Sequence, residues 1–528
     1  MTIATEHKNP AAPKVSLKNK FAFAAGDIFG GGSFNIINFL FVPFLTLTVG
    51  IKMYWVGIIL LISKFWDGLI DPFIGQISDA KKYNRFGKRR YFMLIFAPIL
   101  IVALILLFFP WNLITNSQPL KIILTIIVYL FYATTQSFIL IPYYSLGSEM
   151  SADFMERTNI NSIRLAFSIA SSVICVAVPG MIAGPEKGPI SYIVMAAVFG
   201  TFFCIAVLIT ALFAREQIKS PPVTRKISLK EFFKPLKLKT YRYYLAMQMC
   251  SSMGMAVMSS YFFTYVDFWL RSGSYVNTLV YGADRFPIAT VAAAVMFAAQ
   301  IFALPLYFSL IKKKSKTFAY RTGAVIWTVL AMCLFFMPSQ QFTLIEGNLN
   351  IISQTPNGVI FVLAFLLGLG IGGAVLVPHT LFGDVCDAGE LYFGERQEGA
   401  FSGLSNFINT TAQALGLAVA SWIIGFSGYI ETVYTQPNSA LYFEKVYKTL
   451  GKNSWIPIEQ PQSALLAIRI VMGFLPLIIM GIGFAVSLKY KLTRDKQKEI
   501  MDCVKLDKNS DEYIQKREEL ITFLKETK

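Results

Sequence analysis

The sequence predicts an all-α membrane protein with 12 transmembrane helices in two six-helix bundles. Three observations lead to this fold class. Of the 528 residues, 55% are hydrophobic and only 15% are charged, whereas soluble domains carry about 25% charged residues. Apolar stretches long enough to cross a bilayer recur along the whole chain, since a spanning helix needs about 20 such residues. The longest basic connection between them follows the sixth stretch and divides the stretches into two sets of six.

The first 20 residues are polar and basic and lack the pattern of a cleaved signal peptide, so we expect an uncleaved first helix. The expected organisation is a cytoplasmic segment (1–20), an N-terminal bundle (21–214), a central cytoplasmic loop (215–240), a C-terminal bundle (241–490) and a cytoplasmic tail (491–528), which we expect to be helical. The predicted spans are 21–49, 54–79, 91–110, 121–146, 159–183 and 190–214 in the first half, and 241–270, 284–311, 318–338, 357–382, 398–425 and 463–488 in the second.

Lys and Arg residues are distributed very unequally over the connections between the predicted spans. The two terminal segments and the connections on their side of the membrane contain 34 of them, and the opposite loops contain six. Because cytoplasmic loops are enriched in Lys and Arg, we expect a multi-pass protein of the inner (plasma) membrane with both termini cytoplasmic. This orientation explains the net charge of +17 better than a nucleic-acid partner does.

A short phrase recurs at the end of the fourth span of each half. Residues 141–148 read IPYYSLGS and residues 377–384 read VPHTLFGD, so that a proline and a glycine recur at the same spacing. The repetition indicates a duplicated six-helix unit. Parallel repeats of this kind place a transporter's substrate site between the halves, near the middle of the membrane.

Two carboxylates, Asp67 and Asp71, lie inside the second predicted span. A charge at the centre of a span costs roughly 2.5–3.5 kcal/mol on insertion scales, so an intramembrane aspartate indicates a function. Four residues apart, the pair shares one helix face and repels unless a cation or a proton is shared. This pattern predicts a site for a coupling cation, Na⁺ or H⁺. The alternative is pairing with a basic residue, for which Lys64 and Arg164 are the candidates.

Catalytic chemistry is poorly represented in this composition. The six cysteines follow no ligand spacing, and His7 and His379 are the only histidines. We therefore expect no enzyme activity and no cofactor apart from the coupling ion. A membrane receptor or enzyme remains an alternative to a transporter. The outer loop 426–461 would then be the place for a binding appendage.

Two segments resemble signatures of the glycoside–pentoside–hexuronide:cation symporters of the major facilitator superfamily. They are WDGLIDPFIGQISDAKKYNRFGKRR (66–90) and GDVCDAGELYFGERQEG (383–399), supported by FAAGDIFGG (23–31) and ERTNINSIR (156–164). The resemblance extends from the first to the last helix. It implies the major facilitator fold and cation-driven uptake of a sugar or glycoside by alternating access, with a carbohydrate and a monovalent cation or proton as partners.

The resemblance also implies roles for individual residues. Asp67 and Asp71, assisted by the hydroxyl of Ser137, correspond to the cation site, and both aspartates would be the metal ligands if the ion is Na⁺. Tyr144 matches the aromatic residue that stacks on the sugar, and Arg164 matches an arginine early in the fifth helix. Polar residues expected to complete the substrate site are Asp27, Asn406 and Thr410, and the expected conformational latch comprises Asp79, Arg85, Arg89 and Arg90.

Four positions depart from the family pattern. Ile70 replaces an asparagine that helps to hold sodium, which leaves protons as a candidate. Gly31, Leu140 and Thr410 stand where the family has charged residues around the sugar. A less polar solute, such as a lysolipid or another amphiphile, is therefore the alternative cargo.

Overall fold

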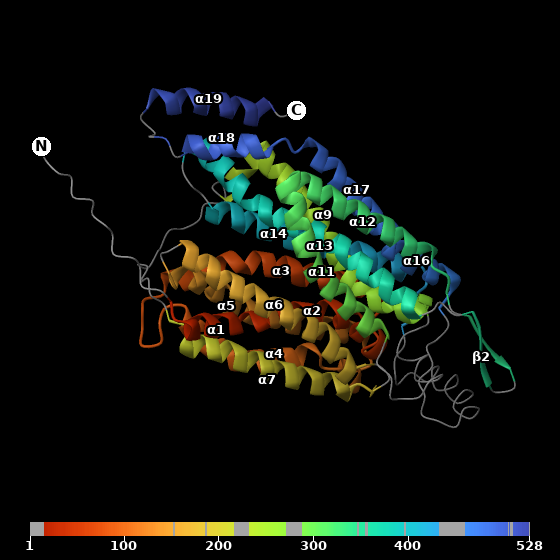
Figure 1. The fold of residues 1–528 in the computed structure, drawn as a ribbon. Helices are drawn as coiled ribbons and strands as arrows, with labels where there is room; N and C mark the ends of the chain where they lie inside the picture. Colours follow the sequence, from red (N-terminus) through yellow and green to blue (C-terminus); the bar gives the residue numbers. More distant parts are fainter. Residues whose placement is uncertain are drawn as a thin grey trace, which may run out of the picture.

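The computed structural model consists of two helical halves that lie side by side (Figure 1). It describes residues 15–151, 154–184, 187–215, 232–270, 288–339, 341–345, 348–353, 357–394, 398–431, 460–504, 506 and 510–526. Most of the predicted N-terminal segment, of the central loop and of the outer loop 426–461 falls outside these residues.

The N-terminal half contains the first six predicted spans. The first is bent at Gly26 and consists of α1, α2 and the π-helical turn η1. The other spans are unbroken, and a short 3-10 turn, η2, follows the third. The bounds are α1 Leu17–Ala25, α2 Asp27–Pro43, η1 Phe44–Thr48, α3 Met53–Ala80, α4 Arg90–Leu107, η2 Trp111–Leu113, α5 Gln118–Glu149, α6 Phe154–Ile182 and α7 Ile190–Phe213.

The C-terminal half contains the remaining spans and the helical tail. Its last span is broken at Gly473 into α16 and α17, and the tail forms two further helices, as expected. The bounds are η4 Lys234–Lys237, α9 Lys239–Thr264, η5 Tyr265–Leu270, α11 Ile288–Lys313, α12 Lys316–Phe336, α13 Asn357–Phe393, α14 Glu398–Phe426, α16 Gln462–Met472, α17 Phe474–Lys489, α18 Arg494–Val504 and α19 Asp511–Glu526.

Eleven helices among the described residues are long and apolar enough to cross a membrane. The predicted seventh span, α9 with η5, is not among them because it carries many polar side chains. It is nevertheless helical from Lys239 to Leu270 and packs against α2, α13, α14 and α17, which shield those side chains from lipid. The predicted fold of two six-helix halves is therefore confirmed.

Two details of the predicted elements were wrong. The loop between α12 and α13, where we expected no strand, contains an antiparallel hairpin, β1 Gln341–Ile345 and β2 Asn348–Ser353, in which Leu344 pairs with Leu349. The tenth helix continues to Phe393 instead of ending near residue 382. Its additional turns leave the apolar span and pack against α18, so they need no lipid-facing surface.

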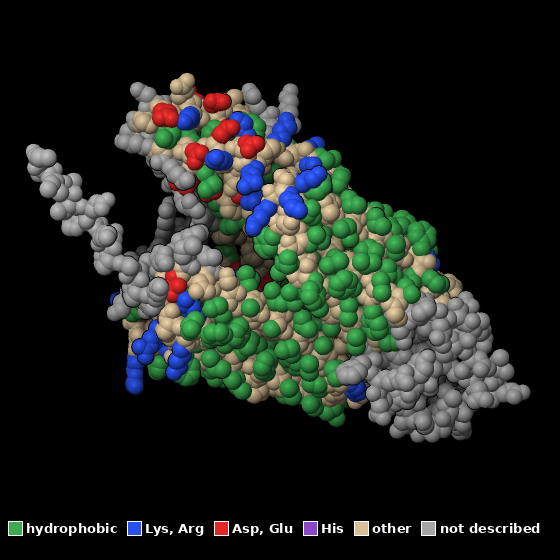
Figure 2. Space-filling view, viewed as in Figure 1, with side chains coloured by type: hydrophobic (Ala, Val, Ile, Leu, Met, Phe, Trp, Pro, Cys, Tyr) green, Lys and Arg blue, Asp and Glu red, His purple; other side chains and the backbone are tan. Residues whose placement is uncertain are grey.

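The two ends of the bundle differ in charge and in closure. We call the end with residues 81–90, 312–316 and 489–498 the basic end, and the end with residues 49–52, 111–117 and the β1–β2 hairpin the hairpin end. Figure 2 shows a hollow between the halves at the basic end.

Contacts between the halves close the hairpin end. The ring of Phe39 lies 5.4 Å from that of Phe263, measured between ring centres, and Glu431 accepts a hydrogen bond from the Met53 amide at 2.7 Å. Gly57 lets α3 and α14 approach closely, since a Cβ there would lie 2.8 Å from the Cβ of Ser421. The structure therefore represents a state open at the basic end.

Candidate functional site

Asp71 is held by one donor from each half of the molecule. The Ser137 hydroxyl on α5 donates to Asp71 Oδ1 at 2.6 Å, and Asn406 Nδ2 on α14 donates to Asp71 Oδ2 at 3.0 Å. Ser137 thus lies where the resemblance implies. Asn406, which we expected in the substrate site, contacts the cation-site carboxylate instead. Hydrogen bonds to a charged acceptor are the stronger ones, so Asp71 connects the halves through two such contacts.

Asp67 is half-buried one helical turn away on the same face of α3. Lys64, a further turn away, is buried, and its Nζ lies 4.8 Å from the ring centre of Phe34. Within the described part of the chain neither aspartate forms an ion pair with Arg164 or within 4.0 Å of Lys64, but the buried Lys64 ammonium is close enough to attract both carboxylates electrostatically. The two carboxylates and the Lys64 ammonium therefore form one cluster of charges on α3, and the predicted cation site at Asp67 and Asp71 stays a prediction.

The predicted substrate residues Asp27, Tyr144 and Arg164 come together from three helices of the N-terminal half. Arg164 Nε on α6 lies 3.9 Å from Asp27 Oδ2 at the start of α2. The same guanidinium lies 5.4 Å from the ring centre of Tyr144 on α5. Gly30 leaves room beside them, because a Cβ there would lie 2.7 Å from Asp27 Oδ1. The group presents an aromatic ring, a cation and a carboxylate, which suits a polar solute.

Thr410 is not part of that group. Its side chain is 8% exposed, and its hydroxyl donates to the Asn406 carbonyl of the same helix at 2.9 Å. The hydroxyl proton is thereby used within α14, the oxygen can still accept a hydrogen bond, and the expected contact of Thr410 with the substrate stays a prediction.

Arg89 is the centre of the predicted latch. Its Nη2 lies 2.6 Å from Asp79 Oδ1 and 3.0 Å from Glu149 Oε1, while Nη1 donates to Ser78 Oγ at 2.8 Å. Burial opposes the charged form, but hydrogen bonds and charges from Glu149 and Asp79 raise the pKa of Arg89 above its ordinary value. The guanidinium therefore stays charged and connects the ends of α3 and α5.

The other two predicted latch residues behave differently. Arg90 Nη2 donates to the Leu212 carbonyl at the end of α7 at 2.7 Å, which is the expected contact with a helix end. Arg85 is exposed, and its guanidinium lies 5.9 Å from the ring centre of the adjacent Phe86. Arg90 therefore fits the predicted latch in this state, and no latch contact of Arg85 is observed among the described residues.

The sequence analysis missed an equivalent ion pair in the second half. Lys316 Nζ at the start of α12 lies 2.6 Å from Asp384 Oδ2 on α13, and Gln497 of α18 also donates to Asp384. Asp384 is the last residue of the repeated phrase, so its position was a usable signal. Its partner was not predictable, because the pair joins helices that are distant in sequence.

Known proteins resemble this chain over almost its full length. A family model described as "MFS/sugar transport protein" matches residues 22–494. An uncharacterized symporter of Synechocystis sp. is 26% identical, with 92% of this chain and 96% of the relative covered. The glucuronide carrier protein homolog of Escherichia coli is 24% identical, with 92% of each covered. The sodium-dependent lysophosphatidylcholine symporter 1-B of Danio rerio is 19% identical, with 93% and 90% covered.

A solved structure supports the fold. A mutant form of the nucleoside transporter NupG superposes with a TM-score of 0.57 at 12% identity, covering 90% of this chain and 98% of its own. At that identity the likeness concerns the fold alone. Together with the family match, it confirms the resemblance that the sequence motifs indicated.

Proposed function

Because this chain belongs to the MFS/sugar transport protein family, we propose that it is a secondary active symporter driven by a gradient of Na⁺ or H⁺. The observation that carries the proposal is the position of Asp71, whose carboxylate accepts hydrogen bonds from Ser137 of one half and Asn406 of the other. Alternating access requires the halves to rearrange around a central site. A cation at Asp67 and Asp71 acts where both halves meet and can favour one arrangement over another.

The coupling ion is a cargo of this site rather than a resident cofactor. Asp67 and Asp71 supply carboxylate oxygens, and Ser137 Oγ can supply a further oxygen ligand, as hard cations prefer. Ile70 adds none, and Asn406 uses its amide nitrogen toward Asp71. Either a proton or a sodium ion completed by water is compatible with these donors.

The proposed substrate class is a sugar or glycoside, bound between the halves at Asp27, Tyr144 and Arg164. An exposed tyrosine ring, 47% accessible, offers a stacking surface, and the charged neighbours offer hydrogen bonds to hydroxyl groups. The family description and the glucuronide carrier homolog support this class. We propose no catalytic activity. We place the protein in the plasma membrane with its termini and its open basic end toward the cytoplasm.

A lysolipid or similar amphiphile is the second candidate. The relative from Danio rerio named as a sodium-dependent lysophosphatidylcholine symporter matches 93% of this chain. The absence of charged side chains at Gly31, Leu140 and Thr410 also favours a less polar cargo. Thermal melts of the purified protein with a panel of glycosides and lysophosphatidylcholine would separate the candidates, since a bound substrate stabilises the folded state.

Uptake into proteoliposomes under an imposed Na⁺ or H⁺ gradient tests the proposal directly. Asp67→Asn removes one carboxylate at nearly constant volume. We therefore expect ion-driven accumulation of the solute to be lost while the protein still inserts. The matched control is Asp502→Asn, which makes the same substitution at an exposed residue of α18 outside the spans and should leave accumulation unchanged. Undiminished accumulation by Asp67→Asn would contradict the proposed coupling.

A further inference from the structure

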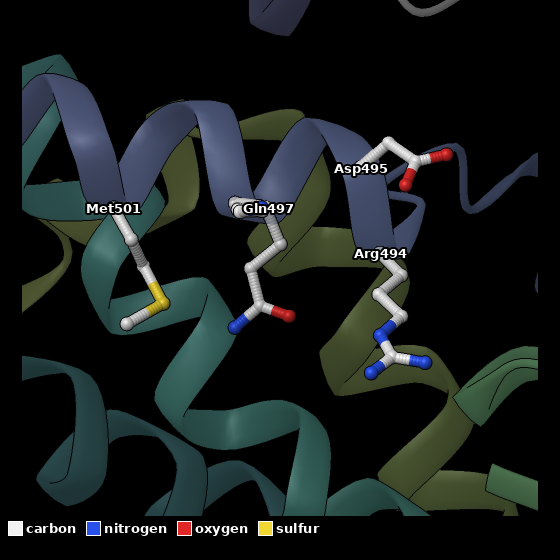
Figure 3. A pocket seen from close by; sticks show the side chains of 5 residues that line it. Arg494, Asp495, Gln497 and Met501 are labelled. Atoms are coloured by element: carbon white, nitrogen blue, oxygen red, sulfur yellow. The ribbon is translucent and has the colours of Figure 1, made fainter. Parts of the chain in front are cut away.

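At the basic end, a half-open cavity of about 560 Å³ lies along α18, and its lining residues Arg494, Asp495, Gln497, Lys498 and Met501 all belong to this helix (Figure 3). Arg494, Lys498 and Met501 recur every three to four residues and therefore share one face of the helix. Figure 3 shows Arg494, Gln497 and Met501 directed to the same side of α18, whereas Asp495 is directed away. This face of the cavity is therefore cationic, with one apolar side chain at its edge.

The framework around the cavity is fixed by hydrogen bonds. Arg494 Nη1 donates to the Lys312 carbonyl at the end of α11 at 3.4 Å, and Gln497 donates to Asp384 of α13. Arg321 of α12 donates to the Ser487 carbonyl of α17 at 2.6 Å. The start of α18 is thus bonded to α11 and α13, and α12 is bonded to α17, so the helix that lines the cavity is held in place on the C-terminal half.

Further basic side chains surround this junction. The exposed ones are Lys312, Lys313, Lys314, Lys489 and Lys491. Figure 2 shows Lys and Arg side chains gathered between the apolar surface of the C-terminal half and the tail helices. Positive loops orient a membrane protein, but orientation alone does not require a cavity lined by such side chains.

Exposed apolar side chains lie in the same helices next to this cationic junction. On α17, Leu488 is 56% exposed directly before Lys489, and Ile482 is 54% exposed farther into the span. On α12, Phe318 is 38% exposed, with Lys314 Nζ 4.9 Å from its ring centre. These apolar side chains lie on helices whose ends are near the cavity: α17 ends five residues before Arg494, and Arg494 donates to the carbonyl of Lys312, which precedes α12.

We propose that this cavity binds the headgroup of an anionic glycerophospholipid from the adjoining leaflet. Its phosphodiester is held by Arg494 and Lys498, and its acyl chains lie along the exposed apolar side chains of α12 and α17. Basic pockets between transmembrane helices at the cytoplasmic side suit such headgroups, and the volume falls in the range of about 300–1,000 Å³ found for ligand pockets. The bound lipid fastens α18 to the C-terminal half, whatever solute the protein carries.

The test is a thermal melt of the full-length protein in detergent, titrated with dioctanoyl phosphatidylglycerol. We expect a saturable rise in the melting temperature, and a much smaller one with dioctanoyl phosphatidylcholine. Arg494→Gln/Lys498→Gln should weaken the apparent affinity for phosphatidylglycerol on the order of 25-fold, about fivefold for each basic residue removed. Arg494→Lys/Lys498→Arg keeps both charges and should retain most of the affinity, which separates lost binding from lost folding.

The matched control is Lys18→Gln/Lys82→Gln, which removes the same charge from exposed residues at the basic end of the N-terminal half. It should leave the affinity within about twofold. An equal loss in this control, or an equal response to phosphatidylcholine, would overturn the proposed site. So would an equal melting shift with glycerol 3-phosphate at the same concentration, because the occupant would then be a free anion.

Discussion

Replacing Ser137 by alanine removes the hydroxyl that donates to Asp71 Oδ1 at 2.6 Å. Ser137 is 3% exposed, so water does not readily replace this donor. A hydrogen bond to a charged group contributes about 1.5–3 kcal/mol, and because Asp71 is itself only half-buried we take the lower value. An energy of about 1.5 kcal/mol corresponds to a change of about tenfold in the apparent affinity for the coupling ion.

The direction of that change identifies the ion. If the ion is Na⁺, Ser137→Ala removes an oxygen ligand, and half-maximal uptake should need about tenfold more Na⁺. If it is a proton, the lost donor no longer stabilises the ionised carboxylate, so half-maximal activation should occur at about tenfold lower proton concentration. Uptake curves in proteoliposomes against Na⁺ at fixed pH, and against pH without Na⁺, measure both.

Two variants control for the loss of a hydroxyl group as such. Ser137→Thr retains the donor and should stay near the parent. Thr135→Val removes a neighbouring buried hydroxyl that donates to the Phe131 carbonyl of its own helix at 2.9 Å, so the ion response should not move. A Ser137→Ala variant with both uptake curves unchanged would refute the view that this hydrogen bond belongs to the coupling site.

Three further predictions concern the ion pairs and the substrate site. Arg89→Gln removes the buried guanidinium that pairs with both Glu149 and Asp79 and should destabilise the protein by about 3 kcal/mol in thermal or denaturant unfolding, whereas the exposed Arg85→Gln should change stability by less than about 0.5 kcal/mol. Lys316→Met should destabilise the protein by about 2 kcal/mol, which is less than for Arg89→Gln because the Lys316 side chain is 28% exposed. An unchanged melting curve would show that its ion pair with Asp384 contributes nothing to stability. Arg164→Lys keeps the charge but loses the planar group beside Tyr144. The apparent affinity for the substrate, read from its thermal stabilisation, should fall at least about tenfold while insertion is unaffected. An unchanged affinity would exclude Arg164 from the substrate site.

The spans were predictable because each helix that crosses lipid must be long and continuously apolar. The seventh span shows the limit of that reasoning. α9 carries polar side chains because it is covered by neighbouring helices, and neighbours are not visible in a linear pattern. The extension of α13 to Phe393 was missed for the related reason that helix beyond the membrane need not be apolar.

The β1–β2 hairpin, in contrast, left a local signal. The segments QFTLI and NLNIIS flank Glu346-Gly347, and two β-prone runs separated by a two-residue turn with glycine are typical of a hairpin. We predicted only a loop because the spans were predicted from long apolar runs, and neither of these short segments is one. The hairpin was therefore predictable from the sequence, unlike the ion pairs between distant helices.

The candidate site divides in the same way. The prediction of a cation site at Asp67 and Asp71 rests on sequence alone, because two charges on one face of a membrane helix are costly without a function. The partners of Asp71 were not predictable in that way: Ser137 was supplied by the family resemblance, and the contact with Asn406 depends on how the halves meet. Asn406 and Thr410 share a face of α14, yet one reaches across to Asp71 and the other bonds within its own helix.

The contact between Asp71 and Asn406 also bears on how the halves move. α3 and α14 pack closely along their length, from Gly57 beside Ser421 near the hairpin end to Asp71 beside Asn406 toward the basic end. A pair that remains packed while the basic end is open is the natural pivot of a rocking motion. At a pivot, side chains change partners without the helices separating, so a cation at Asp71 can compete with the Asn406 amide in either state. Small changes there are amplified at the distant ends of the bundle, so under the proposed function one carboxylate at the pivot is enough to couple ion binding to opening.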